Sequence, residues 1–152
     1  MSGNNPVVGG AVVVGVDGSE ASKDALRWTV RYARRTGATV QAVAAWSFPA
    51  TYGWGLAPAI AEADLEGDAR EALKETLEDV IATEGPVTVQ ARVLQGPPAL
   101  VLEQAAADAD LLVVGNRGFG GFAGMVLGSV SEHCIHHATC PVVVVHHSRD
   151  HH

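Results

Sequence analysis

The sequence predicts an α/β fold, an open five-stranded parallel sheet in the order 3-2-1-4-5 with helices on both faces. Short runs rich in Val and Ala alternate with helical segments in the order βαβαβαβαβ. The runs are almost continuously apolar, which is typical of strands buried on both faces of a parallel sheet. Helical segments of about ten or more residues between such strands indicate right-handed crossovers.

The first two strands flank a helix. A β-branched run predicts a strand at 10–16, which the turn sequence Asp-Gly-Ser at 17–19 ends. Apolar residues at helical spacing predict a helix at about 20–36, and Gly37 closes it as a helix-ending glycine does. Residues 39–46 predict the second strand.

The middle of the chain has the clearest helical pattern. Prolines and glycines predict a loop at 47–58 before it. Apolar residues then recur every three or four positions over 65–81, and the Gly-Pro pair at 85–86 stops this helix. Alternation predicts a third strand at 87–94, and Gly-Pro-Pro opens a third helix at about 96–108.

The last part of the chain carries the loop that matters most for function. It consists of a strand at 110–115, a glycine-rich loop at 116–127, a helix at 129–139 and a strand at 141–147. In open parallel sheets a ligand lies beyond the carboxyl ends of the strands, where the winding direction reverses. In the order 3-2-1-4-5 this point lies between strands one and four, so the loops that follow them should meet.

Length and charge limit the possible functions. The 152 residues are expected to form one domain at 10–147, with loose tails at 1–9 and 148–152. The chain has no signal peptide or membrane span, which predicts a cytoplasmic location. A net charge of −7 and scattered Lys and Arg disfavour binding to nucleic acid or to an anionic membrane. Two cysteines without a secretion signal are weak evidence for a disulfide.

The glycine-rich loop has the spacing Gly115-x2-Gly118-x9-Gly128-Ser129. Glycine adopts positive φ freely and lets backbone amides approach an anion, and the following helix begins with unpaired N–H groups. Ser129, which also suits the N-cap position, and Ser131 add hydroxyl donors. A Walker A loop does not fit because no lysine follows these glycines. Spacing alone leaves two readings open, a phosphate cradle and a structural connection.

This spacing matches the ATP-binding signature of universal stress proteins without a gap, and four further stretches resemble the same family. They are VVVGVDGSEAS (12–22), GPPA (96–99), DLLVVGNRGFGG (110–121) and HHATCPVVVV (136–145). The resemblance runs from about Val12 to His146. It implies the same five-stranded sheet, ATP as the ligand and, usually, a homodimer.

Carried over residue by residue, the resemblance implies two groups of nucleotide contacts. Asp17, at the end of the first strand, would serve the nucleoside, and Ala45, at the end of the second, would offer backbone groups to adenine. The glycine loop would line the ribose and the phosphates with Gly115 and Gly118. The phosphates would lie against Gly128, Ser129, Val130 and Ser131. Asn116 and Phe119 depart from the residues that relatives often carry at these positions.

Several residues also have simpler readings. Asp17 could cap the first helix or hold a turn, and Arg117 could reach a phosphate or lie in solvent. Four residues share helix faces as metal ligands would, yet core or surface use is favoured for them: His133, Cys134, His136 and His137. No nucleophile elbow and no acid–base pair is visible, so at most weak ATP hydrolysis is expected.

The sequence thus predicts an ATP-binding regulatory or stress-response module with an unidentified protein partner. A slow ATPase, or another adenine-nucleotide enzyme on the same fold, is the alternative. Three phosphates in a loop without lysine leave negative charge for Mg²⁺ or Mn²⁺ to balance. The apolar last strand lies at the sheet edge, where a two-fold contact near 142–145 would cover it, so a homodimer is expected.

Overall fold

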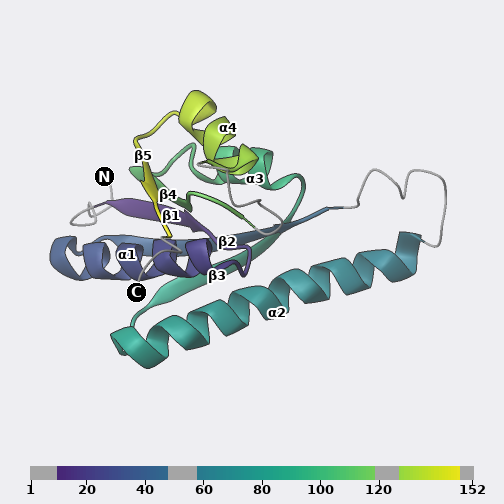
Figure 1. Cartoon of the computed structure of the whole chain (residues 1–152), viewed down its shortest axis with the longest axis horizontal. Helices are drawn as coiled ribbons and strands as arrows, with labels where there is room; N and C mark the ends of the chain where they lie inside the picture. Colours follow the sequence, from purple (N-terminus) through teal and green to yellow (C-terminus); the bar gives the residue numbers. More distant parts are fainter. Residues whose placement is uncertain (1–9, 48–57, 119–126, 148–152) are drawn as a thin grey trace, which may run out of the picture.

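The sheet has the predicted order. The computed structural model describes residues 10–47, 58–118 and 127–147, so the predicted tails at 1–9 and 148–152 lie outside the described residues. Five parallel strands form one sheet in the order β3-β2-β1-β4-β5 (Figure 1). These strands are β1 (Ala11–Gly15), β2 (Thr39–Trp46), β3 (Val89–Gln95), β4 (Leu111–Gly115) and β5 (Val142–Val145). Fold class and strand order are therefore confirmed.

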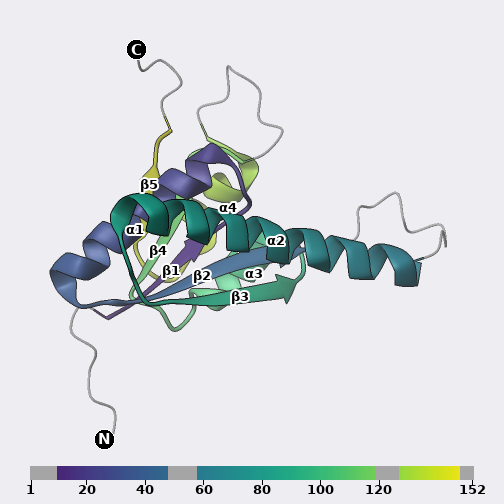
Figure 2. The ribbon, with the colours of Figure 1, turned by 90° about the horizontal axis from the view of Figure 1, so that it is seen from below.

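Helices cover both faces of this sheet (Figures 1 and 2). They are α1 (Glu20–Thr36), α2 (Pro58–Glu84), α3 (Pro98–Ala105) and α4 (Ser129–His137). Successive strand residues point to opposite faces, so Val12 and Val14 pack on the α1–α2 side while Val13 packs on the α3–α4 side. All three valines are at most 2% exposed. The central strand is thus buried on both faces, which explains its unbroken apolar run.

The helices differ from the prediction at their ends. Helix α2 begins at Pro58, well before the apolar repeat, because proline fits the first turn, where its missing N–H is not needed. The predicted loop at 47–58 therefore ends sooner, and residues 48–57 lie outside the described part. Helix α3 ends at Ala105 rather than near Asp108, because short turns follow it, in which Ala107 N–H donates to Gln104 O.

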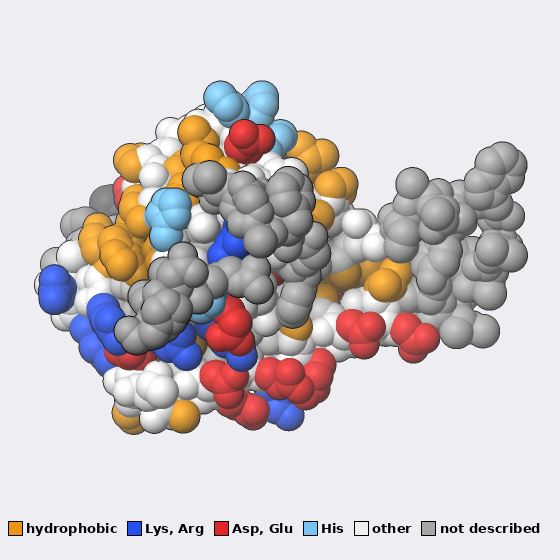
Figure 3. All heavy atoms as spheres, in the orientation of Figure 1, with side chains coloured by type: hydrophobic (Ala, Val, Ile, Leu, Met, Phe, Trp, Pro, Cys, Tyr) orange, Lys and Arg blue, Asp and Glu red, His pale blue; other side chains and the backbone are white. Residues whose placement is uncertain are grey.

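Acidic side chains gather along α2 on the face of the molecule shown in Figure 3. From position 64 on, where the side chains of this helix are described, its exposed carboxylates are Asp64, Asp68, Glu71, Glu75, Glu78 and Asp79. Helix α2 packs on the same face of the sheet as α1, so these charges lie on the opposite side of the sheet from α3 and α4. None of the described helices is long and apolar enough to cross a membrane.

Two fully buried threonines differ in how their hydroxyls are satisfied. Thr29 of α1 and Thr76 of α2 are both 0% exposed. Thr29 Oγ1 donates to Ala25 O at 2.8 Å, whereas Thr76 Oγ1 has no hydrogen-bond partner among the described residues. A buried hydroxyl without a partner loses the hydrogen bonds that water gives it in the unfolded chain.

We therefore predict that Thr76→Val stabilises the protein by about 1 kcal/mol, because valine keeps the shape and removes the unsatisfied hydroxyl. Thr29→Val is the matched control, since the same change there removes a hydrogen bond and should lower stability by about 1 kcal/mol. Urea unfolding of both variants measures the difference. Equal effects at the two positions would show that the Thr76 hydroxyl is satisfied in solution.

Candidate functional site

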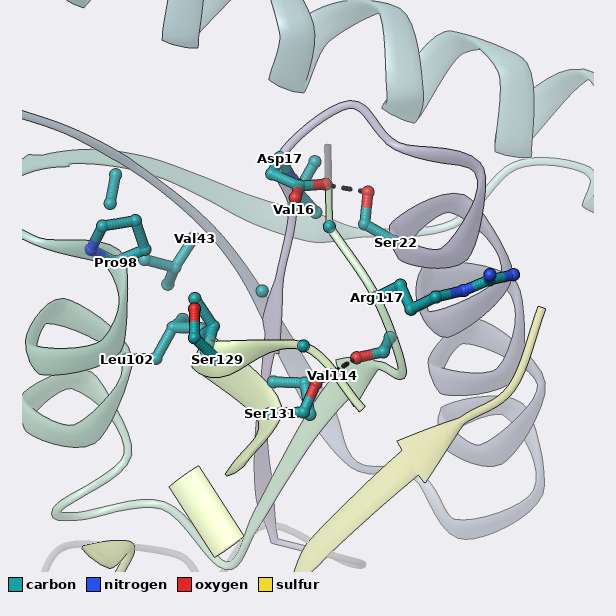
Figure 4. A pocket seen from close by; sticks show the side chains of 16 residues that line it. Val16, Asp17, Ser22, Val43, Pro98, Leu102, Val114, Arg117, Ser129 and Ser131 are labelled. Carbon is teal, nitrogen blue, oxygen red and sulfur yellow. Dashed lines mark hydrogen bonds between the residues drawn. The ribbon is translucent and has the colours of Figure 1, made fainter. Parts of the chain in front are cut away.

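A cavity of about 440 Å³ opens at the carboxyl edge of the sheet, on the α3–α4 side (Figure 4). The ends of β1, β2 and β4 and the first turns of α3 and α4 surround it, as the switch-point argument predicts. All nine residues that the sequence singled out line it: Asp17, Ala45, Gly115, Arg117, Gly118, Gly128, Ser129, Val130 and Ser131. Their role in binding stays a prediction, but the fold brings them to one place.

An apolar wall that the sequence analysis did not assign completes the cavity. It consists of Val16, Val43, Pro98, Leu102 and Val114. The stretch Gly-Pro-Pro-Ala at 96–99 was the only signal for part of it, because this stretch begins the helix that carries Pro98 and Leu102. Among them Val43, Pro98 and Leu102 form a slot between β2 and α3 that suits a flat, weakly polar group.

The end of β2 exposes backbone groups because β1 is shorter. Val16 N–H donates to Val43 O at 2.9 Å, and β1 itself has ended at Gly15. Successive strand residues direct their backbone groups to opposite neighbours, so Ala45 faces the same side as Val43. Trp46 faces the other side, where its carbonyl accepts from Gly96 N–H. Ala45 therefore directs one N–H and one C=O past the end of β1, towards the cavity.

Asp17 holds the turn after β1. Its Oδ1 accepts from the backbone N–H of Ser19 at 2.9 Å and from the Ser19 hydroxyl. The helix cap is Ser19 itself, whose side chain accepts from Ser22 N–H. The turn reading of Asp17 is thus correct and the cap reading is wrong. Its Oδ2 faces Gly118, where an added Cβ would lie only 2.6 Å away.

Helix α4 presents an uncapped N-terminus to the cavity. Its N-cap is Gly128, and no side chain caps it among the described residues. The expectation that Ser129 caps the helix is wrong, because Ser129 is already the first helical residue. Its exposed hydroxyl remains at the cavity, and the first-turn N–H groups have no partner within the helix. The helix dipole adds partial positive charge at the same place.

Ser131 has a different role from Ser129. Its hydroxyl donates to Gly115 O at 2.7 Å, and the residue is only 3% exposed. This bond joins the first turn of α4 to the end of β4. Ser131 lines the cavity, but its hydroxyl fixes the site rather than standing open to a ligand.

The glycines of this site differ in whether the protein has room for a Cβ, and none of them needs positive φ. Gly115, Gly118 and Gly128 are not among the described glycines with positive φ, which corrects part of the sequence argument. At Gly115 a Cβ would lie 2.7 to 2.8 Å from the backbone and Cβ of Ala21, which leaves no room. At Gly128, with φ −79°, the nearest atom would be 3.5 Å away. Alanine at 128 therefore fits against the described residues, and its Cβ would take space that a ligand needs.

Arg117 directs its charge away from the cavity. Its Nη2 donates to the backbone oxygen of His147 at 3.3 Å, and its side chain extends away from Ser129 (Figure 4). A phosphate contact would require another rotamer. Asp17 is then the one carboxylate among the described lining residues, and no cationic side chain among them points inward.

Two histidines of α4 and the two cysteines make other contacts in the described part of the chain. His133 Nε2 lies 2.8 Å from Glu103 Oε1, and the rings of His133 and His137 lie 4.3 Å apart. No group of three potential ligands within 10–47, 58–118 and 127–147 could hold a metal ion. Both cysteines are free thiols, and burial raises the pKa of Cys134 to about 11. Cys134 packs in the core on the α3–α4 side, whereas His136 and His137 are exposed.

A family model described as the universal stress protein family matches residues 10–146. The chain belongs to this family. It is 34% identical to a universal stress protein of Mycolicibacterium smegmatis over 140 residues, which cover 89% of this chain and 47% of that protein. The chain thus spans about half the length of such curated relatives.

Solved structures of universal stress proteins have the same fold. UspA of Lactobacillus plantarum aligns with a TM-score of 0.77 at 25% identity, covering 93% of this chain and 99% of that one. A universal stress protein in complex with cAMP aligns at 0.65 and 30% identity, covering 91% and 97%. The Archaeoglobus fulgidus protein in complex with dAMP aligns at 0.63 and 26% identity, covering 89% and 96%.

Proposed function

We propose that this universal stress protein binds ATP in the cavity and acts as a nucleotide-dependent regulatory module. The observation that carries the proposal is the pairing of two kinds of backbone group across one cavity. At one end Ala45 directs an N–H and a C=O beside an apolar slot, which suits the donor–acceptor edge of adenine. At the other end the uncapped N-terminus of α4 suits phosphate. Relatives in complex with cAMP and dAMP support an adenine nucleotide as the ligand.

The orientation follows from charge. The Asp17 carboxylate would repel a phosphate but can accept hydrogen bonds from ribose hydroxyls, so the ribose belongs between Asp17 and Gly118. The base then occupies the slot near Ala45. The phosphates reach Gly128 and Ser129, where the helix N-terminus is the main source of positive potential.

A regulatory role fits this arrangement better than catalysis. Asp17 and Arg117 are the titratable groups among the described lining residues, and each is already engaged, with Ser19 and with His147. Neither stands ready to activate a water molecule for attack on a phosphate. ATP hydrolysis, if present, would be slow. The effect of the nucleotide would then pass through conformation to a protein partner.

Gly128→Ala tests the proposed position of the phosphates. The added Cβ fits the folded protein but would stand between the α4 N-terminus and a phosphate, so ATP binding should weaken at least about tenfold, or about 1.4 kcal/mol. Gly67→Ala is the matched control, because beyond its own helix turn no atom of the described residues lies within 4 Å of a Cβ added at Gly67 of α2. Isothermal calorimetry with ATP measures both. If Gly128→Ala binds ATP as tightly as Gly67→Ala, the phosphates lie elsewhere.

Metal dependence should increase with the number of phosphates. Asp17 repels a polyphosphate and no inward cation balances it among the described residues, so Mg²⁺ or Mn²⁺ would have to do so. We expect EDTA to weaken ATP binding about tenfold or more and to leave adenosine binding unchanged. Calorimetry of adenosine, AMP and ATP with Mg²⁺ or EDTA provides the comparison. Metal-independent ATP affinity would contradict this charge argument.

We also propose a homodimer through β5. This strand pairs only with β4 among the described strands, so its outer edge is open to a second chain. The carbonyls of Pro141 and Val145 accept from β4-side amides, and strand alternation therefore turns the N–H of Val144 outward. An open row of backbone groups on an apolar strand favours pairing with its own copy.

Val144→Pro should convert the dimer to a monomer, because proline removes the outward N–H while sparing the bonds to β4. Val144→Ala is its control, since it also loses the packing of the valine side chain but keeps the N–H. Lysine at Val143 or Val145 would be less informative, because both side chains pack against the core under α1. Light scattering at micromolar concentration reports the mass. A dimeric Val144→Pro protein would place the interface elsewhere.

A further inference from the structure

We propose that Asn116 is a positioning residue that links the nucleotide cavity to the end of the edge strand β5. The proposal rests on the proposed nucleotide binding for its ligand, but its structural part stands on contacts of the free protein. Asn116 lies between Gly115 and Arg117 in the glycine-rich segment 115–129 (the glycine segment) and is only 5% exposed. No ligand contact is required of it.

Three hydrogen bonds place Asn116 between two parts of the chain. Its N–H donates to Val145 O at 2.9 Å, and its side-chain Oδ1 accepts from His147 N–H at 3.0 Å. Both bonds continue the β4–β5 ladder beyond the strands themselves. Its carbonyl accepts from Gly128 N–H at 2.7 Å, which joins the two described ends of the glycine segment. One buried residue thus holds the end of β5 and the cap of α4.

His147, the last residue of this ladder, has two further partners. Arg117 Nη2 donates to His147 O at 3.3 Å, and its guanidinium lies near the end of β5 in Figure 4. His147 Nδ1 lies 2.6 Å from Asp24 Oδ2 of α1. The other oxygen of Asp24 accepts from Arg27 at 2.8 Å. The end of β5 is therefore fixed by two neighbours from the glycine segment and by one residue of α1.

This geometry implies a linkage in both directions. Gly115 and Gly118 line the cavity, whereas the side chain of Asn116 between them bonds to His147, so a ligand that holds Gly115 and Gly118 in place also favours the ladder to His147. Gly128 N–H donates to the carbonyl of Asn116, and Gly128 is the N-cap of α4, the helix that faces the cavity. Linkage is reciprocal, so if the ligand stabilises this ladder, loosening the end of β5 weakens ligand binding by the corresponding factor.

A pair of variants at His147 tests the linkage from outside the cavity. His147→Pro and His147→Ala both lose the imidazole and its contact with Asp24, but only proline also lacks the N–H that donates to Asn116 Oδ1. The position lies beyond β5 at the end of the described chain, so neither change disturbs the core. We expect amide exchange of Gly128, followed by NMR without nucleotide, to be at least about fivefold faster in His147→Pro than in His147→Ala. With Mg²⁺–ATP as the probe, affinity should fall by a similar factor.

Substitution of Asn116 itself provides the second arm. Asn116→Ala removes the acceptor for His147 N–H and should speed exchange at both His147 and Gly128. Asn116→Asp keeps an acceptor oxygen and should restore slow exchange, which a general packing defect would not do. If Gly128 exchange is the same in both His147 variants, the linkage is wrong even if ATP binds. If ATP does not bind but Gly128 exchange responds as expected, the proposed function fails while the Asn116 linkage stands.

Discussion

The pairing of β1 with β4 at the centre of the sheet is the constraint on which the site depends. The register joins Val12 to Leu111 and Val14 to Val113, and the chain winds in opposite directions on either side of this pair. Helices α1 and α2 therefore lie on one face, and α3 and α4 on the other. The connections after β1 and β4 separate as they leave the sheet, and the cavity opens between them. The connections after β1 and β4 bring Asp17, Arg117 and Gly118 to this cavity.

Small residues at the strand ends keep the separating elements close together. Gly15 ends β1, where a Cβ would lie 2.7 Å from Leu102 of α3, and Gly115 ends β4 against the backbone of Ala21. A larger residue at Gly15 would require the Leu102 side chain to move, and one at Gly115 would push the start of α1 away from the sheet. The structural reading of the glycine loop is therefore correct for Gly115. Gly128 is different, because the protein leaves room for a Cβ there. One glycine pattern thus combines a packing requirement with a surface kept open at the α4 N-terminus.

The sequence predicted what short-range patterns control. Apolar runs and turn residues predicted the elements, and the strand order followed from the crossovers and the family resemblance. What it could not predict depends on long-range contacts. Nothing local distinguishes Ser19 from Asp17 as the cap, or directs Arg117 to a carbonyl thirty positions away. No pattern near His147 indicated its partners, which come from α1 and from the segment after β4. Proline at 58 resembles a loop residue, although it begins a helix.

Recognition in this site would rely on backbone groups, which explains how the fold tolerates so much side-chain change. The Ala45 amide and carbonyl follow from the length difference between β1 and β2, and the anion site follows from the start of α4. Neither depends on a particular side chain, so a site of this kind would tolerate sequence change. Universal stress proteins in complex with cAMP and with dAMP share this fold at 30% and 26% identity. Side chains would then decide how nucleotide binding is coupled to other parts of the structure. In this chain we assign this coupling to Asn116. Its backbone carbonyl accepts from Gly128 N–H at the cavity, and its side-chain oxygen accepts from His147 N–H beyond β5.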